Sequence, residues 1–112
     1  MKRGEVYNAR LDPTVGSEQS GIRPVVIVSR DAINDHSPVV LAVPCTTYRG
    51  QRVFPSQVVV RAGEGGLSVD TVLMAEQVRT LDKARVLTIR GTLTAPVLSE
   101  LDLALRIALD LS

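Results

Sequence analysis

The feature that most constrains the fold is a succession of short β-branched runs. The runs Pro24–Ser29 (PVVIVS) and Pro38–Pro44 (PVVLAVP) are almost continuous in Val, Ile and Leu, which is typical of strands buried on both faces. We expect the two prolines of the second run to mark its ends, because proline cannot donate a hydrogen bond to a sheet. Further strands are predicted at Val6–Leu11, Gln57–Arg61, Thr71–Thr80 and Arg85–Ile89.

The last segment of the chain changes to a helical period. After Thr94, apolar residues recur at helical spacing at Leu98, Leu101, Leu105, Ala108 and Leu109. Thr94 is a candidate N-cap, and Pro96 is tolerated in a first turn. We therefore expect the chain to close with an amphipathic helix.

Polar segments separate the predicted strands. Asp12–Ile22 and Thr46–Phe54 are predicted to be long loops, and Arg30–Ser37 could hold a helical turn. About five to seven short strands followed by one helix predict a mainly β fold, a small curled sheet or barrel. A length of 112 residues suits one domain, residues 1–112, with one core.

Charge gives only a weak indication of a partner. Residues 1–61 carry eight Lys and Arg against five Asp and Glu, whereas residues 62–112 carry five against seven. The positive excess in the first half favours an anionic partner there, although an ordinary mixed surface explains it equally well. Hydrophobic residues make up 45% of the chain, which is enough for a packed core.

Several kinds of site are not expected. The sequence has no glycine-rich phosphate loop, and one histidine (His36) with one cysteine (Cys45) cannot supply a zinc site, so we expect no metal and no cofactor. Cys45 follows an apolar run, which favours a buried, unreactive thiol over a nucleophile paired with His36. A lone cysteine fits a reducing compartment, and no apolar run reaches the ~18–20 residues of a membrane span. We expect a cytoplasmic protein.

Two polar residues flank the predicted buried strands. Arg23 directly precedes a proline, which restricts it to an extended conformation, and its planar guanidinium suits a phosphate. An ion pair with Glu18 or Glu76 is an equally open explanation for this arginine. Thr46, the first of two threonines after the second run, could donate its hydroxyl to a phosphate oxygen, but threonine is also common in turns.

A polar pair interrupts the predicted strand Thr71–Thr80. Glu76 and Gln77 follow the apolar sequence TVLMA. Neighbouring residues of a strand point to opposite faces, so one of the two is expected to face the core or a concave site. A polar side chain in that position requires a partner or a ligand to offset its desolvation.

In combination, these segments resemble the MazF/PemK (Kid-like) toxins of bacterial toxin–antitoxin systems. The specific combination is Gly16–Gln19 (GSEQ) closely followed by Arg23-Pro24, with Glu76–Thr80 (EQVRT) downstream. The similarity continues in order over essentially the whole chain, through RGEVYNARLDPTVGSEQSGIRPVVIVSRDAIN, VPCTT, FPSQV, LSVDTVLMAEQVRTLDKARV and LDLALRIALDL.

The resemblance implies a fold and an activity. Such toxins share an SH3-like barrel of the CcdB/PemK type and cleave single-stranded RNA, chiefly mRNA, at short motifs without a metal. They leave a 2′,3′-cyclic phosphate and a 5′-hydroxyl, and so inhibit translation and growth. By motif position, their catalytic arginine and hydroxyl fall on Arg23 and Thr46. Because the pKa of arginine lies above ~12, we expect Arg23 to stabilise charge on the phosphate, and the general base remains unassigned.

The resemblance also implies contacts and partners. The RNA-binding residues of the family fall on Ser17, Glu18, Gln19, Thr47, Thr71, Glu76 and Gln77. Tyr48 and Phe54 could add base stacking. The implied partners are single-stranded RNA, a MazE-like antitoxin and a second copy of the chain. Many relatives have a histidine in the segment matched by residues 55–57, where this chain has Gln57.

One alternative function uses the same fold. A CcdB-like toxin poisons gyrase without being an enzyme. CcdB-like chains resemble one another in ending with Trp-Gly-Ile, whereas this chain ends with Ala-Leu-Asp-Leu-Ser and contains no tryptophan. This difference favours the ribonuclease.

Overall fold

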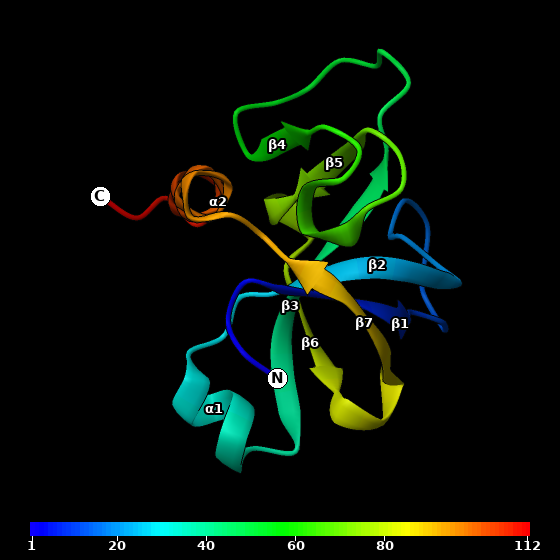
Figure 1. The fold of residues 1–112 in the computed structure, drawn as a ribbon, viewed down its shortest axis with the longest axis vertical. Helices are drawn as coiled ribbons and strands as arrows, with labels where there is room; N and C mark the ends of the chain where they lie inside the picture. The colour runs from blue at the N-terminus through cyan, green and yellow to red at the C-terminus, as the bar shows by residue number, and fades with distance from the viewer.

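The computed structural model describes residues 1–112 as a mainly β fold with a C-terminal helix, as predicted (Figure 1). The strands are β1 (Glu5–Arg10), β2 (Ile22–Ile27), β3 (Val39–Thr47), β4 (Gln57–Val60), β5 (Thr71–Met74), β6 (Arg79–Asp82) and β7 (Val86–Thr92). The helices are α1 (Asp31–His36), α2 (Ala95–Ala108) and the short 3₁₀ helices η1 (Glu64–Gly66), η2 (Ala75–Gln77) and η3 (Lys83–Arg85). Neither α1 nor α2 has the length and apolar character that a membrane crossing requires.

All strand pairs are antiparallel, in the order β4-β5-β3-β2-β1-β7, with β6 beside β3. The sheet curls into an open, barrel-like structure, and α2 lies across one side of it (Figure 1). Seven strands agree with the barrel expected from the run of short apolar segments. This arrangement brings the start of β2, the end of β3 and the start of β5 to one cavity with Arg90 of β7.

The central strand β3 changes partners along its length. Residues 39–42 pair with β6, and residues 45–47 pair with β5. Pro44 pairs with Val25 of β2 on one side, and on the other side it lies in the gap between β6 and β5, so β3 continues to Thr47. The prediction that Pro44 ends this strand is therefore wrong, and the following loop begins after Thr47 rather than at Thr46.

The predicted long strand Thr71–Thr80 is also wrong, because it is divided. The chain pairs with the end of β3 as β5, crosses over as η2, and pairs with the start of β3 as β6. The change of partner within β3 requires this crossing. Glu76 and Gln77 consequently lie in the 3₁₀ turn, and their expected placement on opposite faces of a strand does not apply.

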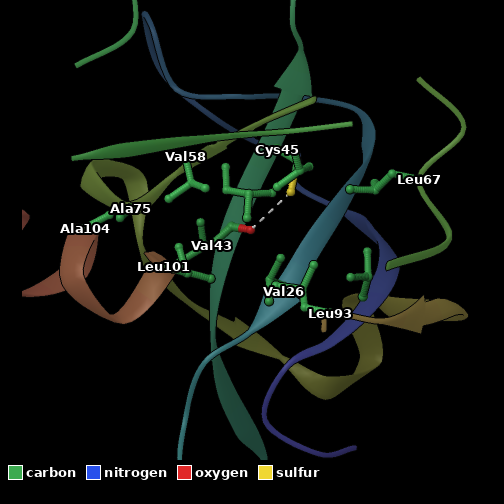
Figure 2. Close-up of a cluster of buried hydrophobic side chains, with 12 residues drawn as sticks. Val26, Val43, Cys45, Val58, Leu67, Ala75, Leu93, Leu101 and Ala104 are labelled. Atoms are coloured by element: carbon green, nitrogen blue, oxygen red, sulfur yellow. Dashed lines mark hydrogen bonds between the residues drawn. The ribbon is translucent and has the colours of Figure 1, made fainter. Parts of the chain in front are cut away.

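The core consists of two clusters on opposite faces of the central strands. Val26 belongs to the larger cluster, whereas its neighbours Val25 and Ile27 belong to the smaller one, so β2 is buried on both faces as predicted. In the larger cluster, Leu101 and Ala104 of α2 face the sheet (Figure 2).

Helix α2 begins where the sequence predicts. Thr94 occupies the N-cap position and Pro96 the first turn. The Thr94 hydroxyl does not cap the helix but donates to Glu64 Oε1 at 2.8 Å, and Glu64 Oε1 also accepts the Thr94 N–H at 2.7 Å. The Glu64 carboxylate of η1 thus accepts hydrogen bonds at the N-terminus of α2, where negative charge is favourable. The contact joins α2 to η1, which shortly precedes Ser68 and Val69.

Candidate functional site

Strand pairing brings Arg23 and Thr46 together. β2 and β3 are antiparallel, and the last pair of their ladder is Val25 opposite Pro44, so Arg23 and Thr46 each lie two residues beyond that pair. Residues two apart in a strand project to the same face, so Arg23 and Thr46 project to the same side of the two strands. Both residues lie inside their strands, so the predictions of Arg23 just before a strand and Thr46 just after one are wrong by a few positions.

Both residues line a cavity of about 170 Å³. Its walls come from β2, the end of β3, the start of β5, the loop before β5, and β7. They comprise Arg23, Pro24, Cys45, Thr46, Thr47, Ser68, Val69, Thr71 and Arg90. The lining contains two arginines and no acidic residue, so the cavity is electropositive and suited to a phosphate.

Arg23 has no carboxylate partner. Neither of the two ion pairs in the structure involves it, so the pairing with Glu18 or Glu76 that its sequence position allowed is not formed. Its Nε donates to the Ser20 carbonyl at 3.2 Å, and its other guanidinium donors have no acceptor in the protein. The side chain is exposed at the cavity wall. Arg23 therefore offers a positioned guanidinium to an incoming anion.

Thr47 and Thr71 face each other across the β3–β5 ladder in the same cavity. Thr46 and Thr47 are half-buried, which leaves their hydroxyls accessible. Thr71 is only 3% exposed, and its hydroxyl donates to the Val69 carbonyl at 2.8 Å. The structure thus brings four of the predicted site residues together, with Thr71 as the most enclosed of them.

The other predicted site residues gather at a second cavity, of about 220 Å³, to which Pro44 of β3 contributes. Gln77 connects its two sides. Its Oε1 accepts the Gln19 N–H at 3.1 Å, and its Nε2 donates to the Ser17 carbonyl at 3.4 Å. Glu18 and Glu76 line the same cavity. Its wall carries amide and carboxylate groups, which can read the edges of nucleobases.

Gln57, the residue that the family resemblance matches to a histidine, binds Glu76, which lines the second cavity. Its Nε2 donates to Glu76 Oε2 at 2.5 Å. An amide does not titrate, whereas a histidine changes charge near neutral pH. In this chain, the hydrogen bond from residue 57 to Glu76 therefore does not depend on the protonation state of residue 57.

The β3–β4 loop carries an exposed cation–aromatic pair. The Arg52 guanidinium lies 5.1 Å from the centroid of the Phe54 ring, which is 48% exposed. Tyr48 is half-buried, and its backbone N–H donates to the Asp70 carbonyl at 2.8 Å. An exposed ring with an arginine beside it is a suitable platform for base stacking.

Cys45 lies in the core beside the cavity rather than presenting a nucleophile. Its side chain is fully buried, and its Sγ donates a weak hydrogen bond to the Val43 carbonyl at 3.8 Å (Figure 2). Burial raises the pKa of the Cys45 thiol from its ordinary 9.0 to about 12, against a smaller lowering by the positive charge of Arg90. His36 is exposed at the end of α1, remote from this cavity lining. The prediction of a buried thiol is confirmed.

This burial makes Cys45 inert toward alkylation. We expect iodoacetamide at pH 8 to leave Cys45 unmodified in the folded protein and to modify it readily in urea, because only the unfolded chain exposes a thiolate. The thiol stays protonated in the folded state while the unfolded chain ionises above pH 9, so its contribution to stability is lost as pH rises from 9 toward 12. Cys45→Ala should remove that part of the pH dependence of unfolding. Rapid alkylation of the native protein would contradict this.

Arg90 of β7 is the site residue that the sequence did not predict. Strand pairing sets Val6 opposite Gly91 and Tyr7 opposite Ile89, so Arg90 is the extra residue of a β-bulge. It lines the same cavity as Arg23. The only local signal is Gly91, because glycine inside a strand pattern often marks a bulge or a close backbone approach.

Comparisons with known proteins agree with this fold and site. Residues 2–109 match the family model described as the PemK-like, MazF-like toxin of type II toxin–antitoxin systems. An endoribonuclease MazF of Staphylococcus epidermidis is 39% identical over 112 residues, which is 100% of this chain and 93% of that protein.

Solved structures give the same result. A mycobacterial endoribonuclease in complex with its cognate antitoxin is 29% identical, with a TM-score of 0.83 over 100% of this chain and 97% of that one. A MazF of Deinococcus radiodurans is 28% identical, with a TM-score of 0.83 over 98% of this chain and 96% of that one.

Proposed function

The chain belongs to the PemK-like, MazF-like toxin family of type II toxin–antitoxin systems, and we propose that it cleaves RNA in the cavity between Arg23 and Thr46. As a member of this family it is an endoribonuclease toxin, and its similarity to MazF favours this activity over a CcdB-like gyrase poison. The observation that carries the proposed site is the register of β2 and β3. Just beyond the last pair of this ladder, Arg23 brings a guanidinium without a carboxylate partner and Thr46 brings a hydroxyl to one cavity without acidic residues.

The proposed chemistry is an internal transfer at one phosphate. The ribose 2′-oxygen attacks the adjacent phosphorus, the bond from phosphorus to the 5′-oxygen breaks, and the products are a 2′,3′-cyclic phosphate and a 5′-hydroxyl. The 2′-hydroxyl loses a proton and the leaving 5′-oxygen gains one, so no metal or cofactor is consumed. The attack increases negative charge on the phosphate oxygens, and donors fixed around them stabilise that charge.

Arg23 and Thr46 have different roles in this proposal. Arg23 supplies a positive charge and planar N–H donors that its neighbours leave free, and Thr46 supplies a neutral hydroxyl from the opposite strand. A guanidinium stays protonated and is therefore a poor base. In this proposal Arg23 stabilises the charge of the transition state.

The second cavity is proposed to recognise the bases beside the cleavage point. Glu18, Gln19, Glu76 and Gln77 line it, and Ser17 accepts a hydrogen bond from Gln77, whereas Thr47 and Thr71 belong to the wall of the first cavity. In the free protein, Gln77 is occupied by the backbone of residues 17 and 19. A base edge would exchange with these contacts. RNA with flexible single-stranded segments presents such edges, which paired RNA hides.

We further propose that residues 1–112 form one toxin domain, that the toxin acts in the cytoplasm as a homodimer, and that a MazE-like antitoxin neutralises it. A mycobacterial relative has been solved in complex with its cognate antitoxin. An acidic antitoxin segment would be attracted to the cavity that contains Arg23 and Arg90, because that lining contains no carboxylate of its own. Occupation of this cavity by the antitoxin would exclude RNA.

The purified protein should cut a long single-stranded RNA in the presence of EDTA. We expect fragments with 5′-hydroxyl ends and 2′,3′-cyclic or 3′-phosphate ends, read by end-labelling and by sequencing of the ends. The same RNA annealed to its complement is the control and should be cut much more slowly. Intact single-stranded RNA at micromolar protein would contradict the activity. Cleavage that requires added metal, or that leaves 5′-phosphate ends, would contradict the mechanism.

A further inference from the structure

A bulge in β7 turns Arg90 toward the cavity. The pairing of β1 with β7 steps from Val6–Gly91 to Tyr7–Ile89, which leaves Arg90 without an opposite residue. A bulge redirects the side chain of its extra residue and is frequent beside active sites. Arg90 consequently lines the cavity that contains Arg23 and Thr46, although β7 is the last strand in the order and is separated from β2 by β1.

The guanidinium of Arg90 is held in place without being neutralised. Its Nε and Nη2 donate to the Gly66 carbonyl, each at 3.3 Å. Nη1 donates to Asn8 Oδ1 at 3.2 Å, and Nη2 also donates to Ser68 Oγ at 3.4 Å. All three acceptors are uncharged, and neither ion pair of the structure includes Arg90. The result is a fixed positive charge at a cavity wall.

These contacts suit anion binding better than proton transfer. All of these bonds are between 3.2 and 3.4 Å long. Those to Asn8 and Ser68 can be exchanged for phosphate oxygens, while the two bonds to the Gly66 carbonyl keep the side chain oriented. Arg23, in contrast, makes one bond to the protein and lies on the strand that pairs with that of Thr46. The two arginines therefore differ in freedom as well as in position, which argues for separate phosphates.

We propose that Arg90 binds an RNA phosphate next to the one that is cleaved and thereby positions the substrate. This inference rests on the proposed function, because it takes the phosphate between Arg23 and Thr46 as the reacting one. A contact to a non-reacting phosphate is made equally in the ground state and the transition state, so it contributes to binding and leaves the chemical step unchanged. It also makes binding depend on salt.

The test separates binding from cleavage. Binding is measured by fluorescence anisotropy with a mixed-sequence, fully 2′-O-methylated RNA oligonucleotide, which cannot be cleaved whether or not the protein is a nuclease. Kd is measured at several salt concentrations for the wild type, Arg90→Gln, Arg90→Lys and the matched control Arg30→Gln. Arg30 is exposed at the start of α1 and lines no cavity, so Arg30→Gln removes the same charge from a distant surface.

We expect Arg90→Gln to raise Kd about tenfold at moderate salt and to reduce the slope of log Kd against log salt by about 0.7. Arg90→Lys should keep the wild-type slope, since it keeps the charge, and Arg30→Gln should match the wild type. On a cleavable RNA, Arg90→Gln should raise KM with kcat within about threefold of the wild type. A merely structural role would lower stability without altering the salt slope.

Two results would overturn the role of Arg90. One is an unchanged Kd and salt slope in Arg90→Gln, and the other is a large fall in kcat with unchanged Kd, which would place Arg90 on the reacting phosphate. Failure of the proposed function has a different signature, since the wild type itself would then leave the cleavable RNA intact while the binding comparison remained measurable.

Discussion

Replacing Arg23 by alanine should abolish cleavage of single-stranded RNA while the protein stays folded. Arg23 is exposed and its side chain makes one hydrogen bond, so its removal should change the free energy of unfolding by less than about 0.5 kcal/mol. Its effect on the reaction is expected to be much larger, because it is the charged member of the pair that we propose to hold the phosphate. Loss of a charged, positioned donor costs on the order of 10³-fold in rate, or about 4 kcal/mol of transition-state stabilisation.

The measurement is single-turnover cleavage of an end-labelled RNA with excess protein. Arg30→Ala is the matched control, since it removes one positive charge from an exposed site that does not line the cavity, and it should cleave at the wild-type rate. Arg23→Lys keeps the charge but loses the planar fork, and we expect an intermediate rate. Cleavage by Arg23→Ala at the wild-type rate would show that the reacting phosphate lies elsewhere, even if the protein is a ribonuclease.

The sequence predicted the fold well in segments whose pattern of apolar residues depends only on the burial of that one segment. The apolar run that contains Val25, Val26 and Ile27 is buried on both faces, as its continuous β-branched character indicated. The helical period after Thr94 gave the start of α2 correctly. Such patterns depend on local burial, which a single segment records.

The sequence failed where a strand has two partners. Pro44 reads as a strand end, yet β3 passes through it because its partners change from β6 to β5 at that point. The same change divides the predicted Thr71–Thr80 strand into β5, η2 and β6. No local pattern encodes which strand lies alongside another, so these boundaries follow only from the tertiary pairing.

The candidate site shows the same division. Arg23 and Thr46 could be singled out from their neighbours, but their proximity depends on the β2–β3 register, which neither segment contains. The resemblance to the toxin family linked Arg23 with Thr46 as one site, and the pairing of β2 with β3 supplies the physical reason. Arg90 was missed because a bulge places it, and the sequence offers only Gly91 as an indication. The cavity is thus a product of pairing irregularities as much as of residue type.

Replacing Gly66 by alanine should severely destabilise the protein. A Cβ at this position would lie 2.1 Å from the Arg90 carbonyl oxygen and 2.6 Å from its carbon, and both are backbone atoms that cannot rotate away. The residue also has a φ of +73°, which disfavours any side chain. Positive φ costs about 1–2 kcal/mol and the steric overlap about 1–3 kcal/mol more. The total is a large share of the ~5–15 kcal/mol that stabilises a typical domain.

Gly21→Ala is the matched control for this prediction. Gly21 has almost the same φ, +75°, but a Cβ added to it would meet nothing within 4 Å, so it should show only the backbone cost. Urea unfolding followed by circular dichroism should therefore give a midpoint for Gly66→Ala that is lower than that of Gly21→Ala by about 1 M. The difference between the two variants isolates the close approach of η1 to β7, the contact that also carries the Gly66 carbonyl to the Arg90 guanidinium. Equal midpoints for the two variants would mean that the two segments can move apart freely, and the fixed position of Arg90 would then have no structural basis.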